Sequence, residues 1–272
     1  MVTLVNYLLE DYSYSTVSKV LVTTGINDGG PQAKTEVLDF SIAEKFECKD
    51  LPDYPIAVGG ATVGFLGNKV LVCGGGLYTY TTYNNQETTD ECYSINVGGT
   101  VFVTKMLYKR WHAASVNVNK DTIWISGGHD NYGDILSSSE LMKVEGSMAG
   151  PELPMPLQDH KMIAINSDLI MVIGGYSPAS GILSQTFYYD HLNGHWIDGP
   201  TLNQVRINHA AGIITDGATH ERLVIVTGGV DGLGAYYYNA FKSTEILQDG
   251  DWSLGILFTL HVSYQIYDIY RK

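Results

Sequence analysis

One short pattern occurs five times along the chain: an apolar run of β-strand character ends in a doublet of small residues, usually Gly-Gly. The runs are Val20–Gly25, Val70–Gly75, Ile123–Gly128, Ile170–Gly175 and Val224–Gly229. The doublets end at residues 25, 75, 128, 175 and 229, which gives steps of 50, 53, 47 and 54 residues. A period of roughly 50 residues built from strands indicates a β-propeller, in which each repeat forms one blade.

Each repeat contains three further elements around the doublet strand. An apolar segment precedes it, at Gly59–Leu66, His112–Val118, His160–Ile165 and His209–Thr215. A polar loop and a third strand follow it, at Thr35–Phe40, Asp90–Ile95, Ser139–Val144, Thr186–Asp190 and Thr244–Gln248. A fourth element carries Trp196 in one repeat and Trp252 in the next. Four short strands per repeat predict four-stranded antiparallel blades.

The repeated residues are expected to have structural roles. Glycine in a doublet permits positive φ and close approach of the next blade. Trp196 and Trp252 are expected to fill the wedge between blades. Four third strands carry a glutamate that would accept backbone hydrogen bonds or pair with arginine between blades. The motif residues are Gly25, Gly74, Gly75, Gly127, Gly128, Gly174, Gly175, Gly228, Gly229, Glu36, Glu91, Glu140, Glu245, Trp196 and Trp252.

The order of these elements resembles the kelch repeat over roughly residues 19–255, and the third to fifth repeats match best. The resemblance implies an all-β propeller over residues 1–255, with Val2–Leu9 supplying the inner strand of the first blade. Kelch propellers usually have six or seven blades, whereas five repeats are recognisable here. Residues 256–272 are read as a closing strand, a divergent sixth blade or an unrelated tail, and an incomplete or divergent ring is favoured. An unpaired blade edge would permit self-association.

Charge and cysteine content narrow the function classes. The formal net charge of -13 disfavours nucleic acid and anionic membranes and suits a basic protein partner. No apolar run approaches the roughly 20 residues that span a bilayer. The absence of a basic leader and of an Asn-x-Ser/Thr sequon favours an intracellular location. Cys48, Cys73 and Cys92 are expected to be free, mostly buried thiols, with a bridge from Cys73 to Cys92 as the alternative.

Function is expected at the loops on one face of the propeller. Strand directions alternate within a blade, so the links from strand two to strand three, and from strand four to the next strand one, share a face. The rim residues predicted to bind a partner are Arg110, His112, His129, Asp130, Tyr78, Tyr176, Arg206, Asn208, His209 and Asp231. By resemblance to peptide-binding kelch domains, Arg110, Arg206 and His209 would grip an acidic or carboxamide-bearing segment, with Tyr78 and Tyr176 as stacking surfaces. The alternative is that several of them pair with neighbouring carboxylates.

The favoured function is a non-enzymatic protein-protein interaction module, with an adaptor role by analogy. No BTB segment is recognisable, so ligase adaptors would come from another chain or a longer isoform. The alternative is a sugar-modifying enzyme resembling the sialic-acid mutarotases among kelch propellers, which would use Arg110, Arg206 and His209. A non-functional remnant is the third hypothesis. No cofactor or metal site is expected, because His112, His129, His160 and His209 lack tight ligand spacing.

Overall fold

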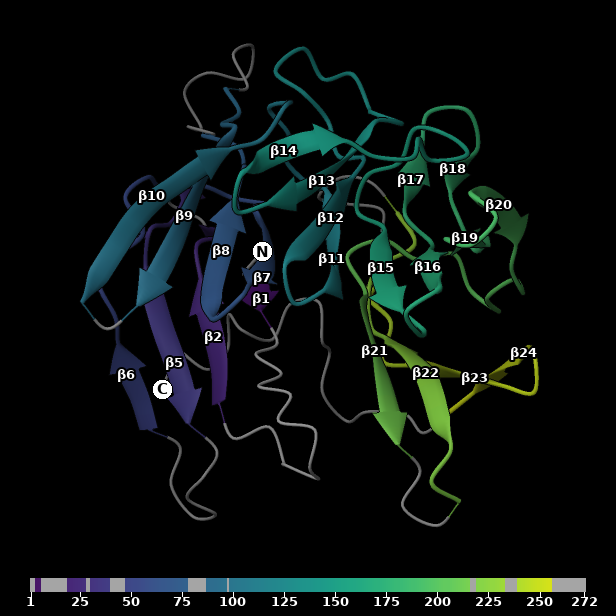
Figure 1. Ribbon diagram of the computed structural model, residues 1–272. Helices are drawn as coiled ribbons and strands as arrows, with labels where there is room; N and C mark the ends of the chain where they lie inside the picture. Colours follow the sequence, from purple (N-terminus) through teal and green to yellow (C-terminus); the bar gives the residue numbers. More distant parts are fainter. Residues whose placement is uncertain are drawn as a thin grey trace.

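The computed structural model describes residues 3–5, 19–27, 30–39, 47–77, 87–96, 98–215, 219–232 and 239–255. The described chain is all-β and forms five four-stranded antiparallel sheets, which follow one another in chain order around a ring (Figure 1). Each sheet is one blade, numbered 1 to 5 along the sequence. The predicted propeller with four strands per repeat is therefore confirmed.

The strands of blades 1 to 3 are as follows. Blade 1 contains β1 (Thr3–Val5), β2 (Lys19–Thr23), β5 (Thr35–Asp39) and β6 (Glu47–Asp50), with the small hairpin β3 (Ile26–Asn27) and β4 (Gly30–Pro31) inserted. Blade 2 contains β7 (Thr62–Leu66), β8 (Lys69–Cys73), β9 (Glu91–Asn96) and β10 (Gly99–Lys105). Blade 3 contains β11 (Ala114–Asn119), β12 (Thr122–Ser126), β13 (Ser139–Lys143) and β14 (Gly146–Ala149).

Blades 4 and 5 repeat this order. Blade 4 contains β15 (Lys161–Ala164), β16 (Leu169–Ile173), β19 (Thr186–Asp190) and β20 (His195–Asp198), with the hairpin β17 (Tyr176–Ser177) and β18 (Gly181–Ile182) inserted. Blade 5 contains β21 (Ala210–Thr215), β22 (Arg222–Thr227), β23 (Thr244–Gln248) and β24 (Asp251–Leu254). Every predicted doublet run coincides with the second strand of a blade.

The core lies between the faces of successive blades. Inner strands contact one another from β7 to β11, from β11 to β15 and from β15 to β21. Trp124 of blade 3 packs on Val172 and Tyr189 of blade 4, and Met171 of blade 4 packs on Val224 of blade 5. The second strands β8, β12 and β16 are buried on both faces, which explains their continuous apolar runs, because a blade inside the ring is covered on both sides.

The far face of blade 5 is less covered. Ile225 stands at the position that Trp124 and Met171 occupy in blades 3 and 4, where both are fully buried, yet Ile225 is only half-buried. Ile214 on the neighbouring strand is 40% exposed. Residues 256–272, on which the predictions about ring closure rest, lie outside the described part of the chain.

The glycine doublets have the predicted conformation. Both residues of each Gly-Gly doublet have positive φ, and Thr24 takes the same conformation, with φ 56°, where the first repeat lacks a glycine. A Cβ on Gly175 would lie 2.7 Å from the Cβ of His160, which comes from the link leading into the same blade. The doublets therefore both turn the chain and let the link pack on the backbone.

The structure agrees with the positions predicted for the two tryptophans and disagrees with the free thiols predicted for two of the cysteines. Trp196 and Trp252 pack between blades, and their indole N–H groups donate to the backbone oxygens of Glu152 and Pro200. The expectation of free thiols at Cys73 and Cys92 is wrong. These residues stand directly opposite each other on β8 and β9 and form a disulfide, with 4.1 Å between their Cα atoms.

No helix long and apolar enough to cross a bilayer occurs among the residues that the structure describes.

Candidate functional site at the loop face

The predicted rim residues belong to two sets of links that share one face of the propeller, here called the loop face. One set joins the second and third strands of a blade, and the other joins one blade to the next. Among the described residues, the links on the opposite face are short turns, such as residues 120–121 and 144–145. The loop face therefore carries nearly all the irregular backbone of the described chain, where binding residues usually lie.

Arg110 and Arg206 are fully buried and do not reach the surface, which corrects the prediction that they grip a ligand. The Arg206 Nε atom lies 3.0 Å from Oε1 of Glu245, and Arg110 Nη2 lies 3.2 Å from Oε1 of Glu140. All four side chains have an exposed fraction of 0%. The alternative prediction, pairing with a neighbouring carboxylate, describes both arginines, and Glu140 and Glu245 supply the carboxylates.

The two buried pairs have the same bonding pattern. Arg110 Nη1 donates to the backbone oxygens of Gly127 and Ser138, and Arg206 Nη1 donates to those of Gly228 and Ser243. Each glutamate also accepts a backbone N–H from the preceding link, Leu107 in one case and Asn203 in the other. Each unit fastens a link to the doublet and third strand of the blade that follows.

Blade 4 replaces this unit with apolar residues. Leu157 stands at the position of the arginines and Phe187 at that of the glutamates, and both are buried in the same cluster. Pro154 stands where Leu107 and Asn203 supply the N–H donor, and proline has no such donor. The three positions therefore change together, which is expected when a buried charge is tolerated only with its partners.

His160 and His209 fill the space between blades rather than facing a ligand. Their exposed fractions are 1% and 2%, and His160 Nε2 lies 2.9 Å from the hydroxyl of Ser126. Ile173 stands at the position of Ser126 beside His209, whose ring nitrogens have no hydrogen-bond partner among the described residues. Burial lowers the pKa of both histidines to about 3, and the nearby ammonium group of Lys161 adds to the effect. The prediction that His209 contacts a partner is therefore corrected.

Two rim residues, His112 and Asn208, share one strained backbone position with Asp159 at the inner end of the links. His112, Asp159 and Asn208 have φ values of 56°, 55° and 55°, and Gly60 holds the position in blade 2. The His112 N–H donates to the Gly60 oxygen, and the Asp159 N–H donates to the His112 oxygen. Non-glycine residues with positive φ cluster at functional sites, so this inner ring is a candidate for ligand contact.

The inner ring contains a carboxylate-imidazole pair. His112 Nδ1 lies 2.5 Å from Oδ1 of Asp159, and Gln158 donates to the other carboxylate oxygen. Burial opposes the charge of Asp159, but His112 and Lys161 outweigh it and lower the pKa of this carboxyl. An ionised Asp159 holds the Nδ1 proton of His112 and leaves Nε2 as the second functional atom of the ring.

His129 packs behind this pair and is itself nearly buried. Its ring stacks on His112 with centroids 5.8 Å apart, and its Nδ1 accepts a hydrogen bond from the indole N–H of Trp111. Burial, with a smaller contribution from His112, lowers the pKa of His129 to about 4. His129 is therefore neutral near pH 7, with its Nε2–H available as a donor.

Two predicted aspartates brace loops instead of facing a ligand directly. Asp130 Oδ1 accepts the backbone N–H groups of Tyr132 and Asp134. Asp231 accepts both the backbone and the side-chain N–H of Asn239, and these bonds lower the pKa of its carboxyl. Each aspartate thus closes a loop between the second and third strands of its blade.

Tyr132 is the most exposed large apolar side chain described, and sequence reasoning missed it. It stands at the tip of the loop that Asp130 braces, with 89% of its surface exposed. The neighbouring Asn131 accepts the backbone N–H of Thr88 in blade 2, so the loop is fastened at both sides of the tyrosine. The repeat motif does not include the loop tip. The only signal in the sequence is that no other repeat has a matching residue at the position of Tyr132.

The remaining predicted tyrosines differ in position. Tyr176 is half-buried on β17 and exchanges two backbone hydrogen bonds with Gln158. Tyr78 lies outside the described residues. The structure therefore brings His112, His129 and Asp159 together, buries Arg110, Arg206 and His209, and leaves Asn208 half-buried on the inner ring.

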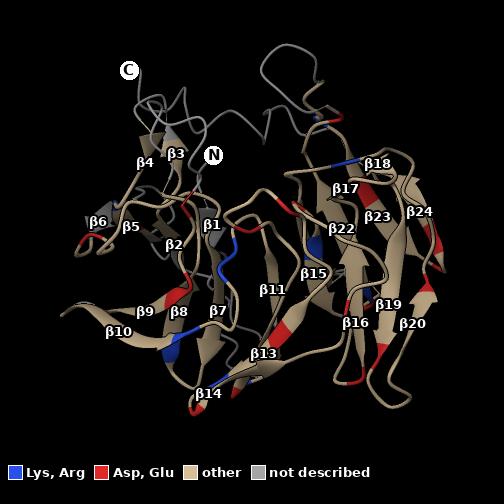
Figure 2. Ribbon diagram, turned by 90° about the horizontal axis from the view of Figure 1, so that it is seen from above, with Lys and Arg blue, Asp and Glu red and all other residues tan. Residues whose placement is uncertain are grey.

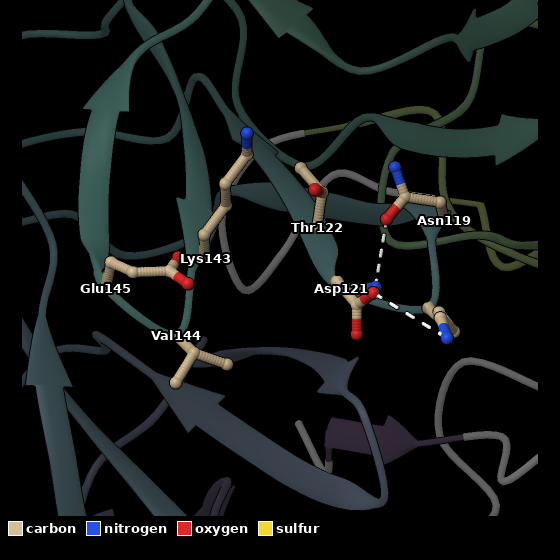
Figure 3. A pocket seen from close by; sticks show the side chains of 7 residues that line it. Asn119, Asp121, Thr122, Lys143, Val144 and Glu145 are labelled. Carbon is tan, nitrogen blue, oxygen red and sulfur yellow. Dashed lines mark hydrogen bonds and ion pairs between the residues drawn. The ribbon is translucent and has the colours of Figure 1, made fainter.

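A shallow hollow of about 660 Å³ lies on the opposite face between two turns (Figure 3). It is lined by Asn119, Lys120, Asp121, Thr122, Lys143, Val144 and Glu145. Its polar contacts are local: the Asp121 N–H donates to Asn119, and Lys120 lies 4.0 Å from Asp121. Within the described ranges, no three His, Cys, Asp or Glu residues are grouped so as to hold a metal ion.

Comparison with known proteins supports a kelch-like β-propeller. No protein-family model matches the chain. Alpha-scruin of Limulus polyphemus, a kelch-repeat protein, is 26% identical over 179 residues, which are 62% of this chain and 19% of alpha-scruin. The match thus spans about a fifth of that relative. The solved structure of YjhT, a kelch-type propeller, has a TM-score of 0.74 at 12% identity and covers 90% of this chain and 82% of its own.

The prediction that the chain is not an enzyme is contradicted. YjhT, which has the same fold, is a sugar-modifying enzyme, a sialic-acid mutarotase. The prediction relied on the missing constellation of catalytic motifs, but a propeller can assemble a site from link residues that are distant in sequence. The fold therefore does not exclude catalysis.

Proposed function

We propose that this chain is a protein-binding module that uses the loop face, with Tyr132 as its main anchor. The observation that carries the proposal is the 89% exposure of a tyrosine in a loop that hydrogen bonds on Asp130 and Asn131 brace. Folding gains little from an aromatic side chain left in water, whereas tyrosine is enriched among the residues that contribute most to protein interfaces.

The bracing of the loop supports this proposal. Asp130 holds the backbone of Tyr132, and Asn131 fastens the loop to Thr88 of the neighbouring blade. A loop that is already ordered loses little conformational freedom when a partner binds, so more of the contact energy appears as affinity. An adaptor or substrate-recognition role would use the same face.

The composition of the neighbouring loops gives further support. Residues 78–86 read YTYTTYNNQ, and residues 233–238 read LGAYYY, both in links between second and third strands. Tyrosine, glycine and asparagine are the residues that binding loops of antibodies use most, because they combine rigid contact area with adaptable hydrogen bonding.

The test compares two truncations of exposed apolar side chains on opposite faces. Tyr132→Ala removes the proposed anchor, and Leu192→Ala removes a 77% exposed leucine from a turn on the other face. We expect immobilised Tyr132→Ala to capture at least tenfold less of the proteins that the native chain retains, since an interface anchor contributes about 2 kcal/mol or more. Both variants should melt at the native temperature. Equal capture by the two variants would refute the proposal.

A second candidate function is a sugar-modifying enzyme, which the His112–Asp159 pair favours. A carboxylate that holds Nδ1–H leaves imidazole Nε2 able to take a proton from a sugar hydroxyl. The residues first proposed for this activity, Arg110, Arg206 and His209, are buried, so His112 takes their place. Interconversion of N-acetylneuraminic acid anomers, followed by NMR, would test it. Rates with the native chain equal to those with His112→Asn would exclude this activity.

A further inference from the structure

We infer that the partner segment bound at Tyr132 is basic and presents an arginine or lysine side chain to this loop. The inference rests on the proposed function of the loop face and adds the chemistry of the partner. It replaces the expectation of an acidic or carboxamide-bearing segment, which depended on arginines that the structure buries, and it agrees with the basic partner that the net charge suits.

Four basic side chains on this face already have acidic partners, whereas Lys109 and Lys242 are exposed in its links. Arg110 and Arg206 are neutralised by buried glutamates. Lys34 lies 3.0 Å from Asp53, and Lys105 lies 3.3 Å from Asp90. An acidic ligand would have to displace these carboxylates, and in the two buried pairs it would also have to open the packing between link and blade.

The charged side chains that the Tyr132 loop itself carries are negative. Asp130 and Asp134 flank it in the loop, and Glu87 is exposed next to Thr88, to which the loop is bonded. Residues 127–138 contain no lysine or arginine, and burial keeps His129 neutral by lowering its pKa to about 4. Asp130 accepts hydrogen bonds only from backbone N–H groups in these contacts. Those donors are neutral, so they do not cancel the negative charge of the carboxylate.

This arrangement matches a guanidinium or ammonium group. The face of a tyrosine ring attracts a cation within about 6 Å, and a carboxylate beside the ring adds a charge-assisted hydrogen bond. Acidic residues occur in every blade (Figure 2), and the net charge of -13 adds a long-range attraction for a basic segment. Such complementarity raises the association rate and penalises acidic competitors.

The experiment uses two fluorescein-labelled 12-residue peptides of glycine and serine, one with four arginines and one with four citrullines. Citrulline keeps the shape of arginine without its charge, so the pair isolates charge. Binding to the full chain is followed by fluorescence anisotropy at 50 mM and 200 mM NaCl. The variants are Tyr132→Ala, Asp134→Asn and Glu145→Gln, the last removing an equal charge from the opposite face.

We expect the arginine peptide to bind at least fivefold more tightly than the citrulline peptide at 50 mM NaCl. Asp134→Asn should weaken the arginine peptide about two- to fivefold, as expected for an exposed ion pair, and Glu145→Gln should leave it unchanged. Equal binding of the two peptides would overturn the inference, and so would an equal loss in Asp134→Asn and Glu145→Gln, which would indicate diffuse charge. If either result occurs while Tyr132→Ala still captures fewer proteins than the native chain in the test of the proposed function, the protein-binding function is retained and the basic partner is rejected.

Discussion

Replacing Arg206 by leucine should destabilise the folded chain strongly, because it leaves the carboxylate of Glu245 buried without its partner. The guanidinium group makes bonds to Glu245 at 3.0 Å, to the Gly228 oxygen at 2.6 Å and to the Gln204 and Ser243 side chains at 2.7 Å each. Breaking a fully buried ion pair by removing one member costs about 3–5 kcal/mol.

The loss should be visible in thermal unfolding. For a domain of this size, 1 kcal/mol corresponds to roughly 2–4 °C in Tm, so Arg206→Leu should lower Tm by about 6–20 °C. An arginine that grips a ligand at the rim would behave in the opposite way, because its truncation would remove partner binding and leave Tm unchanged. The Tm of Arg206→Leu therefore distinguishes a buried structural arginine from a ligand-binding arginine.

The sequence of blade 4 suggests a variant that should restore the lost stability. It carries Pro154, Leu157 and Phe187 at the three positions of the unit, so the triple variant Asn203→Pro, Arg206→Leu and Glu245→Phe transplants its apolar version into blade 5. Replacing a buried ion pair by packed apolar groups is often neutral, and we expect the triple variant to recover most of the lost stability.

Differential scanning calorimetry and urea titration of the native chain, the single variant and the triple variant measure both effects. A change in Tm below about 2 °C for Arg206→Leu would refute the reasoning, because a surface arginine behaves in that way. A triple variant no more stable than the single variant would show that the three positions do not act as one unit.

Three further outcomes are expected. Burial holds the pKa of His160 and His209 at about 3, so the unfolded chain binds more protons than the folded chain between pH about 6.5 and 3. The urea midpoint of unfolding should therefore fall as the pH is lowered through that window. A midpoint that does not change with pH would contradict this. Cys92→Ser opens the disulfide across the β8–β9 link and should cost roughly 3 kcal/mol in thermal unfolding without reductant; an unreduced native chain with three titratable thiols would show that no disulfide forms. Gly229→Ala puts a Cβ 2.6 Å from the Ile207 oxygen, whereas Gly133→Ala meets open space at a similar φ, so the first should lower Tm several degrees more than the second; equal shifts would refute the close approach.

The repeat pattern predicts the fold well because each of its signals has a local cause. A doublet needs positive φ at a strand end, and the doublets adopt it, including Thr24 in the degenerate first repeat. The tryptophans mark the fourth strand, because a wide apolar ring with one N–H donor fits the space between blades. Pairing of Cys73 and Cys92 could have been inferred from their places on adjacent strands, but strand register is not visible in the sequence.

The candidate site is less predictable, because burial of a charged side chain depends on partners in another part of the chain. Arg206 and Glu245 are 39 residues apart, and neither neighbourhood reveals the other. The sequence therefore predicts a rim role for an arginine in a link, with pairing to a carboxylate as the alternative, and it does not reveal which of the two the fold selects. The exposure of Tyr132 has the same origin, since the bonds that hold its loop upright reach Thr88 in another blade.

Comparison of the blades within this chain separates the two kinds of residue. The structural units change as sets, with a donor, a cation and a carboxylate either all kept or all replaced. The sets are Leu107, Arg110 and Glu140 in blade 3, Asn203, Arg206 and Glu245 in blade 5, and Pro154, Leu157 and Phe187 in blade 4.

Tyr132 belongs to no such set, and Ala179 stands at the same offset from the doublet of blade 4. A residue that shares a set with buried partners is explained by stability, because its replacement alone leaves a partner unpaired. Tyr132 has no partner to satisfy, and its exposure to water contributes little to folding, so its place in the chain is better explained by what it binds.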